Sequence, residues 1–117
     1  MRKLILAAAA AVVGLNGVAT AGAVPGPREN TTRVAARATD RYEITFRGGE
    51  TARIVVSGDG DPDLDLYVYD ENGNLVAKDD DSTDYCVVSF TPRWTGKFTV
   101  RVVNRGSVYN QYRITTN

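Results

Sequence analysis

The chain has 117 residues, in which 14 lysines and arginines balance 14 aspartates and glutamates, and it has no histidine. Zero net charge argues against a nucleic-acid partner, whose phosphates attract an excess of basic residues. The lack of histidine excludes Ser-His-Asp and Cys-His catalysis and histidine-based zinc sites, and a single cysteine excludes an intramolecular disulfide.

The N-terminal segment has the pattern of a cleavable signal peptide. Basic residues at positions 2–3 precede an uncharged apolar run over 4–15, and small-x-small motifs follow at 19–21 and 21–23. The run is shorter than the roughly 20 apolar residues of a membrane-spanning helix. We therefore predict a signal peptide over residues 1–23, cleaved after one of the two motifs. The mature chain is expected to leave the membrane for the periplasm or the medium.

The next segment, residues 24–39, holds two prolines and no large aromatic side chain. We expect a flexible leader there, which could end in a short edge strand near Val34. From residue 40 onward, apolar and polar residues alternate with the period of two that is typical of half-buried strands. The expected strands cover residues 42–46, 52–56, 64–69, 75–78, 85–90, 98–102 and 112–114.

Turn signals separate these alternating runs every 8 to 12 residues or so, and no segment has apolar residues at helical spacing over three turns. Seven or eight short strands of this kind are typical of an all-β sandwich or barrel. We favour a sandwich of two antiparallel sheets, formed by one domain over residues 40–117.

The same segments, in their order, resemble the bacterial pre-peptidase C-terminal domain family. An Asp-rich turn and the strand DLDLYVYD lie within residues 57–70, and NGNL follows at 72–75. Further on come SFTP at 89–92, the strand TGKFTVRV over 95–102 and YRI at 112–114. The resemblance covers nearly the whole mature domain.

The resemblance implies a jelly-roll-like β-sandwich, which in this family is usually attached to secreted proteases and other exported enzymes. Such domains assist secretion or bind substrate or matrix, and some bind calcium. No enzyme domain accompanies this one, so we expect a stand-alone copy. Some family members pair two cysteines near the position where this chain has Cys86 alone.

No motif in the mature chain indicates catalysis. Cys86 alternates in phase with Val88 and Phe90, which predicts a buried and unreactive thiol. Two carboxylates could hydrolyse a glycoside, but a domain of this size with its acids along a hairpin edge offers little cleft for a sugar. We predict that the protein is not an enzyme.

Acidic side chains are concentrated in residues 59–84, which hold ten acids and one base. The spacing of the first four follows an EF-hand loop, but Leu64 stands where that loop needs glycine, which excludes an EF-hand. A hairpin closed by a two-residue Asn72-Gly73 turn would instead place Asp65 opposite Asp80. Carboxylates opposed on one sheet face repel each other.

Two interpretations of this acidic hairpin stay open. The acids form a solvated edge that keeps the strand soluble and unpaired, or calcium neutralises them, since it prefers several oxygen ligands. The candidate calcium ligands are Asp59, Asp61, Asp63, Asp65 and Asp80.

A candidate binding platform consists of Tyr67, Tyr69 and Trp94, which are expected to face outward from a strand and a turn. Such aromatic side chains could hold a polysaccharide or a peptide. Alternatively, these side chains only cover the outer face of a sheet and bind nothing, because aromatic residues are common on strands.

These patterns together predict a secreted bacterial accessory or binding module without catalytic activity, with calcium as its candidate cofactor. Its expected partner is an extracellular polymer or a secreted protein. The alternative is a stand-alone inhibitor or chaperone of an exported peptidase.

Overall fold

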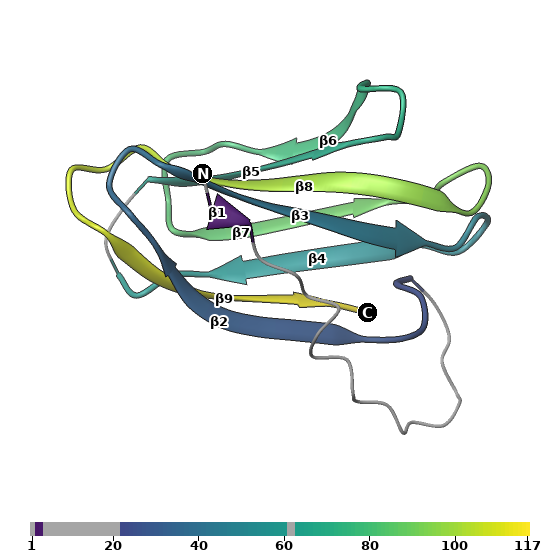
Figure 1. Cartoon of the computed structure of the whole chain (residues 1–117), viewed down its shortest axis with the longest axis horizontal. Helices are drawn as coiled ribbons and strands as arrows, with labels where there is room; N and C mark the ends of the chain where they lie inside the picture. The colour runs from purple at the N-terminus through teal and green to yellow at the C-terminus, as the bar shows by residue number, and fades with distance from the viewer. Residues whose placement is uncertain (1, 4–21, 61–62) are drawn as a thin grey trace.

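A computed structural model describes residues 2–3, 22–60 and 63–117, so most of the predicted signal peptide lies outside the described residues and stays a prediction. The described part is built from strands (Figure 1). None of its residues belongs to a helix that could cross a membrane. The strands are β1 (Arg2–Lys3), β2 (Arg28–Val34), β3 (Thr39–Phe46), β4 (Ala52–Ser57), β5 (Leu64–Tyr69), β6 (Leu75–Asp79), β7 (Tyr85–Phe90), β8 (Gly96–Asn104) and β9 (Asn110–Thr116).

The strands form two sheets. One has five strands in the order β1-β3-β8-β5-β6, and the other has four in the order β2-β9-β4-β7. All pairings are antiparallel except the short one between β1 and β3. In Figure 1, β6, β5, β8 and β3 run across the upper part of the molecule, and β4, β9 and β2 run across the lower part. The prediction of an all-β, two-sheet sandwich is confirmed.

The core lies between the sheets and follows the predicted alternation. Tyr42, Ile44 and Phe46 of β3 are buried, while the residues between them are exposed or half-buried. Phe46 also contacts Phe90 and Phe98, with ring centroids 5.2–5.8 Å apart within this trio. Edge-to-face packing of this kind adds to the stabilisation by apolar burial.

Strand β2 begins the sandwich upstream of the predicted start at residue 40. It lies within the segment 24–39 that was expected to be a flexible leader, and it pairs along its whole length with β9. The sequence RENTTRV has only Val34 as a buried apolar residue. This edge strand is held by backbone pairing with β9. Its sequence therefore needs no alternation of apolar and polar residues, and it has almost none that could be detected.

The β5–β6 hairpin has the predicted register but a longer turn. Tyr67 pairs with Lys78 as expected, and the register shifts by one residue nearer the turn. The Gly73 amide donates to the Asp70 carbonyl (3.0 Å), and the Asp70 amide donates to the Asn74 carbonyl (2.9 Å). The turn between Asp70 and Asn74 therefore contains three residues (71–73) instead of two, and the Asp70 side chain accepts turn amides, as aspartate favours in such turns.

Candidate functional site

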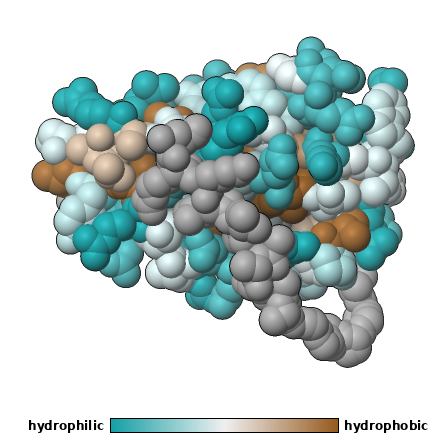
Figure 2. All heavy atoms as spheres, viewed as in Figure 1, coloured by the Kyte–Doolittle hydropathy of each residue, from teal (hydrophilic) through white to brown (hydrophobic). Residues whose placement is uncertain are grey.

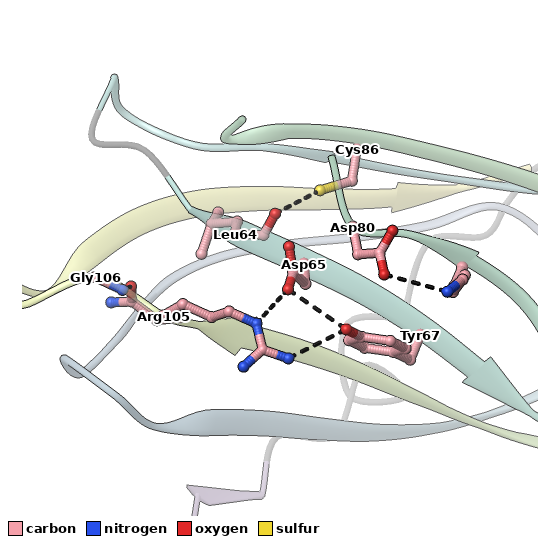
Figure 3. Close-up of polar contacts among 9 residues, drawn as sticks. Leu64, Asp65, Tyr67, Asp80, Cys86, Arg105 and Gly106 are labelled. Atoms are coloured by element: carbon pink, nitrogen blue, oxygen red, sulfur yellow. Dashed lines mark hydrogen bonds and ion pairs between the residues drawn. The ribbon is translucent and has the colours of Figure 1, made fainter. Parts of the chain in front are cut away.

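Asp65, the central predicted calcium ligand, is buried on β5 and paired with an arginine (Figure 3). Its Oδ2 accepts a hydrogen bond from Arg105 Nε and another from the Tyr67 hydroxyl (3.4 Å). Arg105 Nη2 also donates to the Tyr67 hydroxyl (3.2 Å). The hydrogen bond to Asp65 raises the pKa of the Arg105 guanidinium above its usual value. The charge of Asp65 is therefore neutralised within the protein.

Asp80 does not form the expected cross-strand pair with Asp65. Strand β6 ends at Asp79, so Asp80 lies beyond the ladder and forms an ion pair with Lys78 (3.2 Å). The Asp79 carboxylate accepts the Val87 amide of β7 (2.9 Å). The hairpin thus relieves the predicted repulsion by ending before the two acids become opposed.

The remaining candidate ligands also have local roles. Asp59 Oδ2 accepts the Gln111 amide (3.0 Å), and Asp63 has a left-handed backbone (φ 77°) while its carbonyl accepts the Arg105 amide. Asp61 lies outside the described residues.

Among the described residues, no group of three or more His, Cys, Asp or Glu side chains is placed to hold a metal ion. Calcium prefers six to eight oxygen ligands, whereas three of the candidate carboxylates already bind donors of the protein: Asp59 the Gln111 amide, Asp65 the Arg105 guanidinium and Asp80 the Lys78 ammonium group. Calcium binding stays a prediction, which melting curves with calcium and with a chelator at fixed ionic strength test.

The predicted aromatic platform is divided between two places. Tyr67 and Tyr69 lie half-buried on the outer face of β5, where the Arg101 guanidinium covers the Tyr69 ring at 5.0 Å from its centroid. Trp94 lies in the turn between β7 and β8, and 62% of it is exposed. It lines a pocket that neither tyrosine lines.

This pocket has a volume of about 390 Å³ and lies at the end of the sandwich, between the β5–β6 turn and the β7–β8 turn. Phe90 and Phe98 of the core trio line it together with Val76 and Trp94. Its other lining residues are Asp70, Glu71, Asn72, Thr91, Pro92, Arg93, Gly96 and Lys97. The pocket was not predicted, because two turns and parts of three strands that are distant in the sequence assemble it.

Other large apolar side chains are also exposed among the described residues: Leu75, Val76, Tyr85, Val108 and Tyr109. On the face shown in Figure 2, apolar residues form small separate patches among hydrophilic ones. Isolated apolar residues of this kind are ordinary on soluble proteins. The combination of an exposed tryptophan with a pocket backed by aromatic rings therefore singles out the Trp94 end.

The β3–β4 turn fixes the position of Trp94. The Gly48 amide donates to Thr95 Oγ1 (3.0 Å), and the Gly49 amide donates to the Pro92 carbonyl (2.8 Å). A Cβ on Gly48 would lie 2.4 Å from the Trp94 Cα, so only glycine allows the two turns to approach this closely. The pocket wall is thus held by backbone contacts.

Cys86 is buried on β7, as its alternation predicted. Its Sγ lies 3.2 Å from the Leu64 carbonyl oxygen, to which the thiol donates (Figure 3). Burial, with nearby carboxylates adding to it, raises the pKa of this thiol to about 12. It is therefore protonated at neutral pH, which argues against a nucleophilic role.

A buried polar network was missed by the sequence analysis. The Tyr112 hydroxyl donates to Asp40 Oδ2 (2.7 Å) and lies 2.5 Å from the Tyr42 hydroxyl, to which Asn30 also donates (3.4 Å). Burial raises the pKa of Tyr112 above its usual value. Asp40 is in phase with the inward-facing residues of β3, which is the signal that could have placed it inside. The network lies away from the Trp94 pocket and joins the two sheets.

The fold and the pocket define a small antiparallel β-sandwich domain with a pocket at one end. The chain belongs to the bacterial pre-peptidase C-terminal domain family, whose model matches residues 28–104. A search of curated protein sequences found no match.

Solved structures are similar over nearly the whole chain. The pre-peptidase C-terminal domain of a Bacillus anthracis collagenase has a TM-score of 0.63 at 12% identity, covering 99% of this chain and 93% of that one. PliG of Aeromonas hydrophila, a periplasmic inhibitor of g-type lysozyme, has a TM-score of 0.61 at 10% identity, covering 99% and 95%. A PliG mutant from Escherichia coli has a TM-score of 0.52 at 14% identity, covering 100% and 98%. At these identities the likeness concerns the fold alone.

Proposed function

We propose that this protein is an extracytoplasmic binding module without catalytic activity, and that it contacts a protein or polymer partner through the Trp94 pocket. One observation carries the proposal: the chain's single tryptophan is 62% exposed at a pocket lined by the buried Phe98 and the partly buried Phe90. Tryptophan is enriched among the residues that dominate binding energy, where it fills or borders desolvated pockets.

Other features support the same function. The family and the solved neighbours include a domain of a collagenase and a periplasmic inhibitor, which fits the predicted signal peptide. The chain has no histidine, and its one thiol is buried and protonated at neutral pH. These features favour binding over catalysis.

Capture of the partner tests the proposal. The mature protein is immobilised and exposed to the culture medium of its host, and in parallel it is sedimented with insoluble extracellular polymers. We expect a retained partner, and a loss of roughly tenfold or more in retention by Trp94→Ala. Tyr109→Ala is the control, because Tyr109 is similarly exposed (50%) but lies in the β8–β9 loop. Equal retention by wild-type protein and Trp94→Ala would contradict the proposal.

A second candidate function is inhibition of an exported hydrolase. The similarity to PliG spans nearly the whole of both chains, so PliG is an inhibitor that consists of little more than a sandwich of this kind. Activity of a g-type lysozyme and of an exported peptidase is measured with increasing amounts of the protein. Stoichiometric loss of activity would support the inhibitor. Unchanged activity with a retained polymer would support the accessory module.

A further inference from the structure

The charged residues that line the Trp94 pocket differ in what they already bind. Asp70 accepts the amides of Asn72 and Asn74 (both 2.9 Å) and the Asn74 side-chain amide (3.3 Å). These hydrogen bonds, that from the Asn74 amide first, lower the pKa of Asp70. Its acceptor capacity is therefore used within the turn.

Glu71 is also turned toward the protein. Its Oε1 accepts the Lys97 amide at 3.4 Å and lies beside Gly96, where an added Cβ would be 3.0 Å away. The Thr91 hydroxyl is likewise paired, with Thr51 Oγ1 at 3.1 Å. Both carboxylate oxygens of Asp70, one of the two of Glu71 and the Thr91 hydroxyl are thus already engaged within the protein.

The basic residues of the pocket have no such partners. Within the part of the chain that the structure describes, the side chains of Arg93 and Lys97 form no ion pair and no hydrogen bond. Both are exposed and line the pocket, as does the indole of Trp94, which carries a donor N–H. The free polar groups are therefore mainly donors, and two of them are cationic.

The pocket wall between these donors is apolar. Phe90, Phe98 and Val76 form it, with Trp94 at the mouth. A sugar would need free acceptors as well as donors for its hydroxyl groups, and few are offered here. An anion with an apolar body meets both properties, because its acceptor oxygens can face the cations while its body covers the rings.

We propose that the Trp94 pocket binds an apolar side chain adjoining a carboxylate, as presented by the C-terminal residue of a partner polypeptide. This inference rests on the proposed function and names the chemistry of its partner. Arg93 and Lys97 bind the terminal carboxylate, and the final side chain packs on Trp94, Phe90 and Phe98. A volume of about 390 Å³ exceeds the lower bound of roughly 300 Å³ for ligand pockets.

The fluorescence of Trp94 gives a direct test, because the chain has one tryptophan. Mature protein is titrated with an N-acetylated tripeptide that ends in phenylalanine with a free carboxylate, and with the C-terminal amide of the same peptide. We expect the amide to bind roughly ten- to a hundredfold more weakly, the range for hydrogen bonds to a charged group. A tripeptide ending in serine should also bind more weakly, since it lacks the apolar side chain.

Two variants separate the cations from general effects. Arg93→Gln with Lys97→Gln should remove the difference between acid and amide without lowering the melting temperature, since neither side chain has a described partner. Arg101→Gln is the matched control and should preserve the difference, because Arg101 lies over Tyr69 outside the pocket. Loss of the difference in the control as well would contradict the assignment.

Three outcomes would overturn the inference: equal affinity for acid and amide, no response to either peptide, or tighter binding of an N-acetylglucosamine trisaccharide. If the natural partner is still captured in a Trp94-dependent way, the proposed function stands and only the ligand chemistry is wrong. If Trp94→Ala captures the partner as well as the wild-type protein does, both the proposed function and the proposed ligand are wrong.

Discussion

At the scale of single residues, Asp65 shows what the sequence could and could not reveal. The predicted register of β5 and β6 was right at Tyr67, but β6 ends at Asp79, before Asp80 could lie opposite Asp65. The partner that neutralises Asp65 was missed because Arg105 is 40 residues away. The β5–β8 ladder pairs Asp65 with Val103, and the turn after β8 then brings Arg105 over it. Such a pair depends on sheet order, which alternation does not encode.

This pair predicts unequal effects of removing its two members. Arg105→Gln leaves the buried carboxylate of Asp65 without its cation, so it should lower the free energy of unfolding by more than the loss of a surface ion pair does. Asp65→Asn leaves an exposed guanidinium that water can solvate, so it should lower the free energy of unfolding by less. Urea denaturation of the mature protein measures both.

Asp80→Asn is the control for that comparison, because it removes a surface ion pair with Lys78 and should change stability by at most about 1 kcal/mol. A more stable Asp65→Asn protein would show that repulsion among the acids outweighs the arginine contact. Calcium-dependent stabilisation that disappears in Asp65→Asn would instead restore the calcium interpretation.

At the scale of elements, strands with an apolar inner face were predictable and the others were not. The alternation of Tyr42, Ile44 and Phe46 identifies β3 because burial of every second residue leaves a pattern. Strand β2 has no such pattern, because Val34 is its only buried apolar residue and the strand is held by backbone pairing with β9. The Trp94 pocket was equally hidden, because its walls come from turns whose proximity follows from the packing of two sheets.

The close approach of two turns predicts a specific effect of Gly48→Ala. The new Cβ would lie 2.4–2.7 Å from backbone atoms of Trp94 and Thr95, which cannot move aside as a side-chain end could. We expect a loss of stability of about 1–3 kcal/mol, typical of overpacking, together with altered Trp94 fluorescence and weaker ligand binding.

The control for Gly48→Ala is Gly26→Ala. A Cβ on Gly26 has nothing within 4 Å, so this substitution should leave the melting temperature and the tryptophan spectrum unchanged. If Gly48→Ala also leaves both unchanged, the β3–β4 turn does not fix the pocket wall.

At the scale of the whole molecule, a short segment before β2 connects the two sheets where β3 and β9 end. The Gly22 carbonyl accepts the Arg47 amide (3.0 Å), and the Ala23 amide donates to the carbonyl of Asn117 (2.8 Å). Ala23 is 1% exposed and belongs to the core. The residues just after the predicted apolar run are therefore part of the folded domain. The two predicted cleavage positions differ in whether they preserve this segment.

Cleavage after Ala21 keeps Gly22 and Ala23 in the domain, whereas cleavage after Ala23 removes a buried side chain and two backbone hydrogen bonds. We therefore predict that the exported protein begins at Gly22, which intact-mass measurement of the secreted product determines. A protein produced with Val24 as its first residue should be less stable by roughly 1–3 kcal/mol, at about 0.5–1.5 kcal/mol for each lost hydrogen bond. A native product that begins at Val24 and melts at the same temperature as one beginning at Gly22 would show that the segment contributes nothing to the fold. A product that retains Met1 would instead contradict the signal peptide.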